Sequence, residues 1–127
     1  MSKKIIASEK APAAIGPYSQ AVQAGNLLFI SGMLPIREGQ LVTDDIAEAT
    51  KACMENLGHV AKEAGASWGD FVKCTIYLTD LGKFAQVNEA YGTFFAEGNP
   101  PARVCVEVCK LPKDAPIEIS AIVAVNK

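Results

Sequence analysis

The sequence predicts an α+β fold in which a single mixed β-sheet carries two helices packed on one face. Three observations support this prediction. A tight-turn signal separates two apolar segments near the N-terminus, two segments have helical periodicity, and β-branched segments lie between and after them. The resulting order is β-β-β-α-β-α-β-β without a repeat or linker, so residues 1–127 are expected to form one domain.

The first two strands are predicted from Gly25-Asn26, a two-residue turn between residues 18–24 and 27–32. This register places Val22 opposite Phe29. It also places Gln20 opposite Ser31, with Tyr18 diagonal to Ser31 on the same face. The polar cluster of Tyr18, Gln20 and Ser31 is either a set of polar side chains at the edge of the sheet without a function or part of a functional site.

Residues 44–64 have the periodicity of a long amphipathic helix. Thr43 or Asp45 can cap its start, Asp45 stands at capping-box spacing from Glu48, and Gly65 ends it. The apolar stripe comprises Ile46, Ala49, Cys53, Leu57, Val60 and Ala64.

Residues 70–78 are predicted to form a strand and residues 81–97 a second helix, capped by Asp80 and closed by Gly98. Asn88 lies on the flank of this helix's apolar stripe, where it is either a half-exposed structural amide or a support for the wall of a site. The stripe comprises Phe84, Val87, Tyr91, Phe94 and Phe95.

The last two strands contain the residues most suited to chemistry. Alternation places Arg103 and Cys105 on one strand face, and an arginine at a strand end can hold a carboxylate with its planar fork. Glu118 lies in the closing strand, 117–125. A surface strand with solvated charges is the alternative.

If residues 110–116 loop between these strands as a hairpin, Glu118 lies opposite a residue near position 108. Arg103 is then roughly 16 Å from Glu118, so a neighbouring subunit would have to complete a site that uses both. The helix-free sheet face is also apolar enough to favour symmetric association. It carries Val22, Phe29, Ile122 and Ala124.

Composition excludes several classes of function. The net charge of −2 and the pI near 5.4 argue against a broad nucleic-acid footprint. The N-terminus lacks a signal-peptide core and no apolar run is long enough to span a membrane, so a cytoplasmic location is expected. His59 is the only histidine, and Cys105 and Cys109 stand about 13 Å apart along a strand, so no metal site is expected.

Several segments resemble, in order and spacing, the RidA/YjgF family of reactive-intermediate (enamine/imine) deaminases. Met33, Cys109 and Ser120 depart from residues common in that family. The matching segments are Ala13-Ala14-Ile15-Gly16-Pro17-Tyr18-Ser19-Gln20-Ala21, Ile30-Ser31-Gly32, Val87-Asn88 with Phe94-Phe95, Pro101-Ala102-Arg103, Val106-Glu107-Val108, Leu111-Pro112-Lys113-Asp114 and Ile117-Glu118-Ile119.

The resemblance implies a chorismate-mutase-like homotrimer with sites between subunits. It implies hydrolysis of 2-imino acids, formed from enamines such as 2-aminoacrylate or 2-aminocrotonate, to 2-keto acids and ammonia without a cofactor. Arg103 would grip the carboxylate and Glu118 would activate water as the catalytic pair. The remaining substrate-binding residues implied are Tyr18, Ser31, Gly32, Asn88 and Cys105.

Other functions fit parts of the pattern. A non-catalytic trimer that binds keto acids would use the same arginine, but a carboxylate at Glu118 would not help it bind an anion. Ribonuclease activity or translation inhibition, attached to some relatives, is disfavoured by a single helix-face histidine, His59. Chorismate-mutase activity rests on fold alone. Cys105 is expected to be a wall thiol and not a nucleophile.

Overall fold

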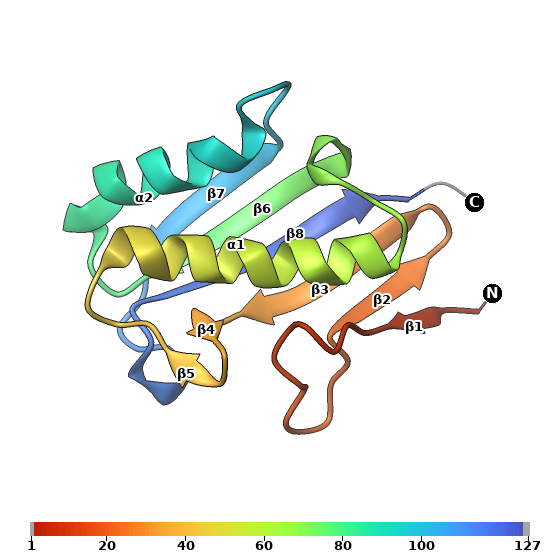
Figure 1. Cartoon of the computed structure of the whole chain (residues 1–127), viewed down its shortest axis with the longest axis horizontal. Helices are drawn as coiled ribbons and strands as arrows, with labels where there is room; N and C mark the ends of the chain where they lie inside the picture. The colour runs from red at the N-terminus through yellow and green to blue at the C-terminus, as the bar shows by residue number, and fades with distance from the viewer. Residues whose placement is uncertain (1, 126–127) are drawn as a thin grey trace.

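The computed structural model describes residues 2–125, and its main element is a six-stranded mixed sheet (Figure 1). The strand order is β1-β2-β3-β8-β6-β7, with β6 and β7 parallel and all other neighbours antiparallel. A small hairpin, β4–β5, stands apart from the sheet. The strands are β1 Lys4–Ile6, β2 Ala21–Ala24, β3 Leu27–Met33, β4 Ile36–Arg37, β5 Gln40–Leu41, β6 Phe71–Leu78, β7 Ala102–Glu107 and β8 Ile117–Ala124.

Both α-helices, α1 Ile46–Glu63 and α2 Phe84–Gly92, pack side by side on the same face of the sheet, as Figure 1 shows. The predicted arrangement of one mixed sheet with two helices on one face is therefore confirmed. Short 3₁₀ turns η1 to η4 connect the larger elements; they are Trp68–Asp70, Leu81–Lys83, Thr93–Phe95 and Pro112–Asp114.

The ends of α1 follow the sequence signals closely. The Asp45 carboxylate accepts hydrogen bonds from the backbone N–H groups of Ala47 and Glu48, and Gly65 takes a positive φ of 82° after the last turn. The Glu48 side chain does not complete a capping box but forms an ion pair with Arg37 of β4 at 3.1 Å.

The second predicted helix, 81–97, is shorter and less regular than expected. Asp80 caps the 3₁₀ turn η2, the α-helical hydrogen bonds span only Phe84–Gly92, and the turn η3 follows. The predicted length was therefore wrong at both ends, although the cap and the apolar face were correct.

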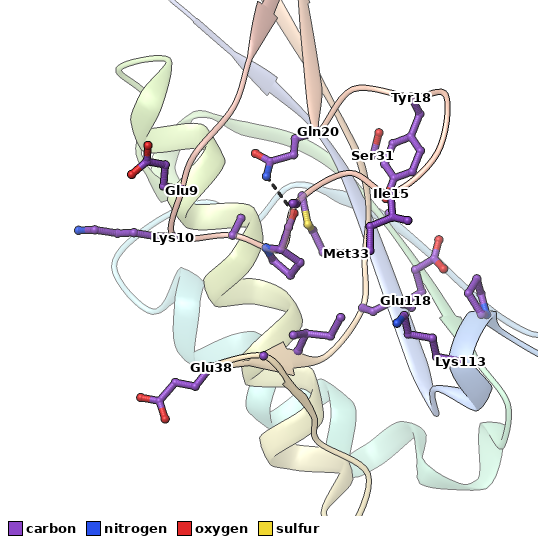
Figure 2. Close-up of a pocket in the computed structure, with 18 residues that line it drawn as sticks. Glu9, Lys10, Ile15, Tyr18, Gln20, Ser31, Met33, Glu38, Lys113 and Glu118 are labelled. Carbon is purple, nitrogen blue, oxygen red and sulfur yellow. Dashed lines mark hydrogen bonds between the residues drawn. The ribbon is translucent and has the colours of Figure 1, made fainter.

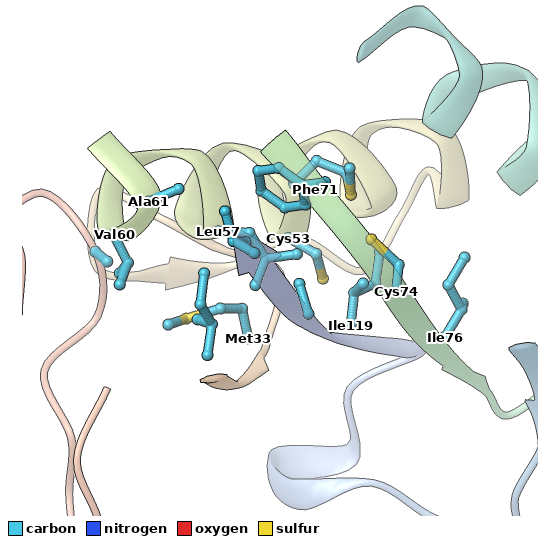
Figure 3. Packing of buried hydrophobic residues seen from close by; sticks show 14 of the residues in the cluster. Met33, Cys53, Leu57, Val60, Ala61, Phe71, Cys74, Ile76 and Ile119 are labelled. Atoms are coloured by element: carbon cyan, nitrogen blue, oxygen red, sulfur yellow. The ribbon is translucent and has the colours of Figure 1, made fainter. Parts of the chain in front are cut away.

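The core lies between the helices and the sheet, where side chains from both layers point toward one another (Figure 3). Cys53, Leu57 and Val60 of α1 are fully buried against Ile76 of β6 and Ile119 of β8. These positions match the predicted stripe of α1 and one face of each strand. Burial of apolar area in this layer is the main stabilising contribution to the fold.

The first hairpin forms in the predicted register, with Val22 opposite Phe29. However, β2 begins at Ala21, so the predicted strand start at Tyr18 was wrong. Tyr18 lies in the preceding loop, where Gly16 has a φ of 118° that favours glycine. The chain turns here before it enters the sheet, which places Tyr18 at the rim of the sheet and not within a strand.

The predicted hairpin between the last two strands does not exist. Strands β7 and β8 lie on opposite sides of β6, with Arg103 beside Cys74 and Glu118 beside Tyr77. The physical reason is the crossover through α2, which returns the chain parallel to β6 and makes β7 an edge strand. The register that placed Glu118 opposite a residue near position 108 is therefore wrong.

Within residues 2–125, neither helix combines the length and hydropathy that crossing a bilayer requires.

Candidate active site

Glu118 is a half-buried carboxylate on the helix-free face of the sheet. Its neighbours in β8, Ile117 and Ile119, are fully buried on the helix side, and alternation turns Glu118 the other way. Within the described residues the carboxylate has no hydrogen-bond donor or ion-pair partner. Burial raises the pKa of Glu118 above its ordinary value.

Gly32 makes room for this carboxylate. A β-bulge interrupts the pairing of β3 with β8 between Ile30 and Met33, and Gly32 lies within it. A Cβ atom at Gly32 would come within 2.7 Å of Cδ of Glu118 and nearer still to Oε2. Only glycine therefore allows the backbone of β3 to approach the Glu118 carboxylate so closely.

A pocket of about 930 Å³ opens beside Glu118, with Tyr18, Ser31 and Gly32 in its lining (Figure 2). The Ser31 hydroxyl donates a hydrogen bond of 2.6 Å to the Ser19 carbonyl, so its remaining capacity is that of an acceptor. Tyr18 is 53% exposed. Three of the predicted substrate-binding residues thus lie together with Glu118.

Gln20, expected in the polar cluster with Tyr18 and Ser31, is a buried structural residue. Its amide donates hydrogen bonds to the carbonyls of Ser8 and Pro12 at 3.2 and 2.9 Å, and its Oε1 accepts one from the Ser8 N–H. These bonds attach the N-terminal loop to β2 and shape one wall of the pocket.

Arg103 lies on the helix face of β7, far from that pocket in the sheet. Its Nη1 donates a 2.6 Å hydrogen bond to Oδ1 of Asn88 on α2. The guanidinium carbon lies 5.3 Å from the centre of the Phe84 ring and 5.2 Å from that of Tyr91. Arg103 and Asn88, which were each predicted as site residues, are therefore in direct contact through their side chains.

Cys105 follows Arg103 on the same strand face and packs against the core while remaining half-buried. Burial raises the pKa of the Cys105 thiol, an effect that the Arg103 charge partly opposes. A thiol with a raised pKa is a poor nucleophile.

The predicted site residues therefore form two groups in one chain, which we call the arginine group (Arg103, Asn88, Cys105) and the glutamate group (Glu118, Gly32, Ser31, Tyr18). The groups lie on opposite faces of the sheet, with β6 between β7 and β8. At ordinary strand geometry Arg103 and Glu118 are also about 10 Å apart along the strands. A single chain does not bring the two groups onto one small ligand.

Sequence reasoning missed several residues of the two groups' surroundings. Phe84 and Tyr91 were assigned only to the core, and Pro112 and Lys113 of the turn η4 were not placed in the pocket. Lys113 has a positive φ of 60°, which is unusual for a residue with a side chain. The Leu-Pro-Lys-Asp motif was the available signal for this turn.

Within residues 2–125, no three metal-binding side chains gather at one point.

Comparisons with known proteins place these observations in a family. A model of the family described as endoribonuclease L-PSP matches residues 8–125. A RutC family protein of Pyrococcus abyssi is 52% identical over 124 residues, covering 96% of this chain and 97% of the relative. The 2-iminobutanoate/2-iminopropanoate deaminase of Escherichia coli K12 is 47% identical over 123 residues, covering 94% of this chain and 95% of the relative.

The fold agrees with these sequence matches. The crystal structure of the YjgF gene product of Escherichia coli superposes with a TM-score of 0.92 at 44% identity, covering 98% of this chain and 99% of that chain. The chain therefore belongs to the endoribonuclease L-PSP family, the RidA/YjgF family whose motifs its sequence carries.

Proposed function

We propose that the protein hydrolyses 2-imino acids, the tautomers of 2-aminoacrylate and 2-aminocrotonate, to 2-keto acids and ammonia. The observation that carries the proposal is the Glu118 carboxylate, which lines a pocket and has no partner among residues 2–125, together with an arginine that is hydrogen-bonded to Asn88. The Escherichia coli deaminase at 47% identity supports the same reaction.

The chemistry follows from the two groups. The Arg103 fork binds the substrate carboxylate through two parallel N–H donors and orients the imine carbon. The Glu118 carboxylate accepts a proton from water as the water oxygen bonds to the imine carbon, and the C=N π electrons move to nitrogen. That proton passes to the nitrogen to give a carbinolamine. Glu118 then moves the hydroxyl proton of the carbinolamine to the same nitrogen, the C–N bond breaks with its electron pair on the departing ammonia, and the O–H bonding electrons form the C=O bond of the keto acid.

The raised pKa of Glu118 suits both steps, because a carboxyl group that titrates nearer neutrality is a stronger base and still returns its proton. Ser31 accepts a hydrogen bond from substrate or water, and Tyr18 lines the same pocket. Positioning of water over an already electrophilic carbon supplies much of the rate enhancement.

We further propose that the site is completed in a chorismate-mutase-like homotrimer, with the arginine group of one subunit facing the glutamate group of the next. Their placement on opposite faces of one chain supports this arrangement. So does the apolar helix-free face, where Ile5, Phe29, Val104 and Val106 are each at least 40% exposed. Closed symmetric association would bury these side chains.

Turnover is tested by coupling the protein to a threonine or serine dehydratase that releases the enamine, with semicarbazide trapping the imine. We expect added protein to lower the trapped imine and to speed ammonia release. Unchanged trapping at all protein concentrations would exclude the deaminase reaction. Binding of 2-ketobutyrate without turnover would instead indicate the regulatory trimer.

Two variants of Arg103 test its role. Arg103→Ala is expected to abolish the effect, and Arg103→Lys is expected to recover only a small part of it, since lysine keeps the charge without the fork. Full activity of Arg103→Ala would remove Arg103 from the carboxylate site.

A further inference from the structure

We propose that Phe84 and Tyr91 of α2 are positioning residues that hold the Arg103 guanidinium in the plane required for a bidentate carboxylate contact. The proposal deepens the function proposed above and rests on it. Neither aromatic residue is assigned to a substrate; each acts through Arg103.

The three residues that contact the Arg103 guanidinium all lie on one face of α2. Phe84, Asn88 and Tyr91 recur at intervals of four and three residues, so α2 presents all three toward the edge strand β7. The two ring centres lie 5.3 and 5.2 Å from the guanidinium carbon, within the range of cation–π attraction. Asn88 holds Nη1 from the side.

These contacts limit which N–H donors of Arg103 remain available to a ligand. The rings occupy positions near the guanidinium carbon, and Asn88 uses one of its five N–H donors. The donors that remain lie in the plane of the guanidinium, where a carboxylate accepts two parallel hydrogen bonds. A fixed plane also lowers the side-chain entropy lost on binding.

Core packing alone does not account for this arrangement. Phe84 is only half-buried, and its ring lies over a cation instead of inside the apolar cluster. Tyr91 is 5% exposed, and its hydroxyl lies beside the Cys74 thiol of β6, so the phenol oxygen faces the core. The ring of Tyr91, and not its hydroxyl, is the part that serves Arg103.

The test uses two ring deletions and two rescues. Phe84→Leu and Tyr91→Leu are each expected to raise KM for the 2-imino acid roughly 3- to 10-fold with kcat within about two-fold, the loss of one cation–π contact. Phe84→Tyr and Tyr91→Phe keep an aromatic ring and are expected to retain the wild-type KM. Phe94→Leu is the matched control, because Phe94 is half-buried on the following turn and its ring packs on Trp68, not on Arg103.

A second readout does not depend on turnover. Arg37 and Arg103 are the only arginines of the sequence, so the NMR spectrum of arginine-labelled protein contains two Nε–Hε signals. We expect Phe84→Leu to lower the order parameter of the Arg103 signal and leave that of Arg37 unchanged, and Phe94→Leu to change neither.

The outcomes separate the two proposals. Wild-type protein without turnover refutes the proposed function, whatever the NMR result. The positioning role alone is refuted if the wild type is active and the Phe84→Leu variant keeps both the wild-type KM and the wild-type order parameter of Arg103. The thermal midpoint of the variant shows that it is folded. Equal KM increases in Phe84→Leu and Phe94→Leu would also refute it, since the effect would then be one of packing.

Discussion

At the level of single residues, Glu118 combines an energetic cost with the chemical role proposed for it. A carboxylate that is partly removed from water and has no donor in the described chain destabilises the fold when it is ionised. The Gly32 bulge keeps it in this position by leaving no side chain in its place. Such a residue is expected where reactivity, and not stability, determines the sequence.

Glu118→Gln is therefore expected to lower activity by roughly 10²–10⁴-fold and to raise the melting temperature near neutral pH. Because the folded pKa of Glu118 is raised, its unfavourable contribution appears as pH rises through that pKa and vanishes in acid. The melting-temperature difference between variant and wild type should thus shrink as pH falls. Thermal unfolding followed from acid to neutral pH measures it; a difference that grows in acid would contradict the account.

Gly32→Ala is expected to displace the Glu118 carboxylate. The expected loss of activity is about 100-fold, because moving a catalytic group by about 1 Å lowers the rate by that factor. The measurement is the steady-state rate in the coupled dehydratase assay. Gly69→Ala is the control, because a Cβ there meets no atom within 4 Å. Equal rates for Gly32→Ala and wild type would show that the contact does not matter.

Some of these residues could be selected from the sequence and others could not. Arg103, Asn88 and Glu118 stand in motifs with a recognisable order, so they were found without coordinates. The contact of Phe84 and Tyr91 with Arg103 depends on where α2 lies against β7, which periodicity alone does not give. A stripe of aromatic residues in sequence looks the same whether it faces the core or a cation.

At the scale of the element, the unit β6–α2–β7 is the one that sequence reasoning assembled incorrectly. Strands β7 and β8 follow one another along the chain, and the short segment between them suggested a hairpin. The structure instead pairs both with β6, through a parallel crossover on one side and an antiparallel return on the other. Local turn signals do not determine which of several strands becomes the partner.

Packing of α1 against the aromatic rings of Trp68 and Phe71 gives a prediction for this pair of elements. A Cβ at Gly58 would lie 2.6 Å from Cζ2 of Trp68, whose ring stacks on Phe71 at 4.8 Å. Gly58→Ala is therefore expected to lower stability by about 1–3 kcal/mol through overpacking. Denaturant unfolding followed by the fluorescence of Trp68, the only tryptophan, measures the change.

Gly92→Ala serves as its control, because Gly92 lies in α2 with no atom within 4 Å of the added Cβ. There the substitution should be neutral or slightly stabilising, given the higher helix propensity of alanine. If both variants were equally stable, Trp68 would have room to move and the packing argument would be wrong.

In the molecule as a whole, the sheet separates the two groups of residues that are proposed to form the site. Its helix face carries the arginine group at the edge strand, and its helix-free face carries the glutamate group beside exposed apolar side chains. The sequence predicted that one chain could not complete the site, but from a hairpin register that is wrong. The same expectation now follows from the opposite faces and the intervening strand β6.

The proposed site requires Arg103 and Glu118 to act together across a subunit boundary. Arg103→Ala and Glu118→Gln, each inactive alone, are co-expressed with different affinity tags, and trimers that carry both tags are isolated. In any such trimer, one of the three boundaries pairs an intact Arg103 with an intact Glu118, so the account predicts about one third of wild-type activity. Mixed trimers as inactive as either parent would show that the two residues do not meet between subunits.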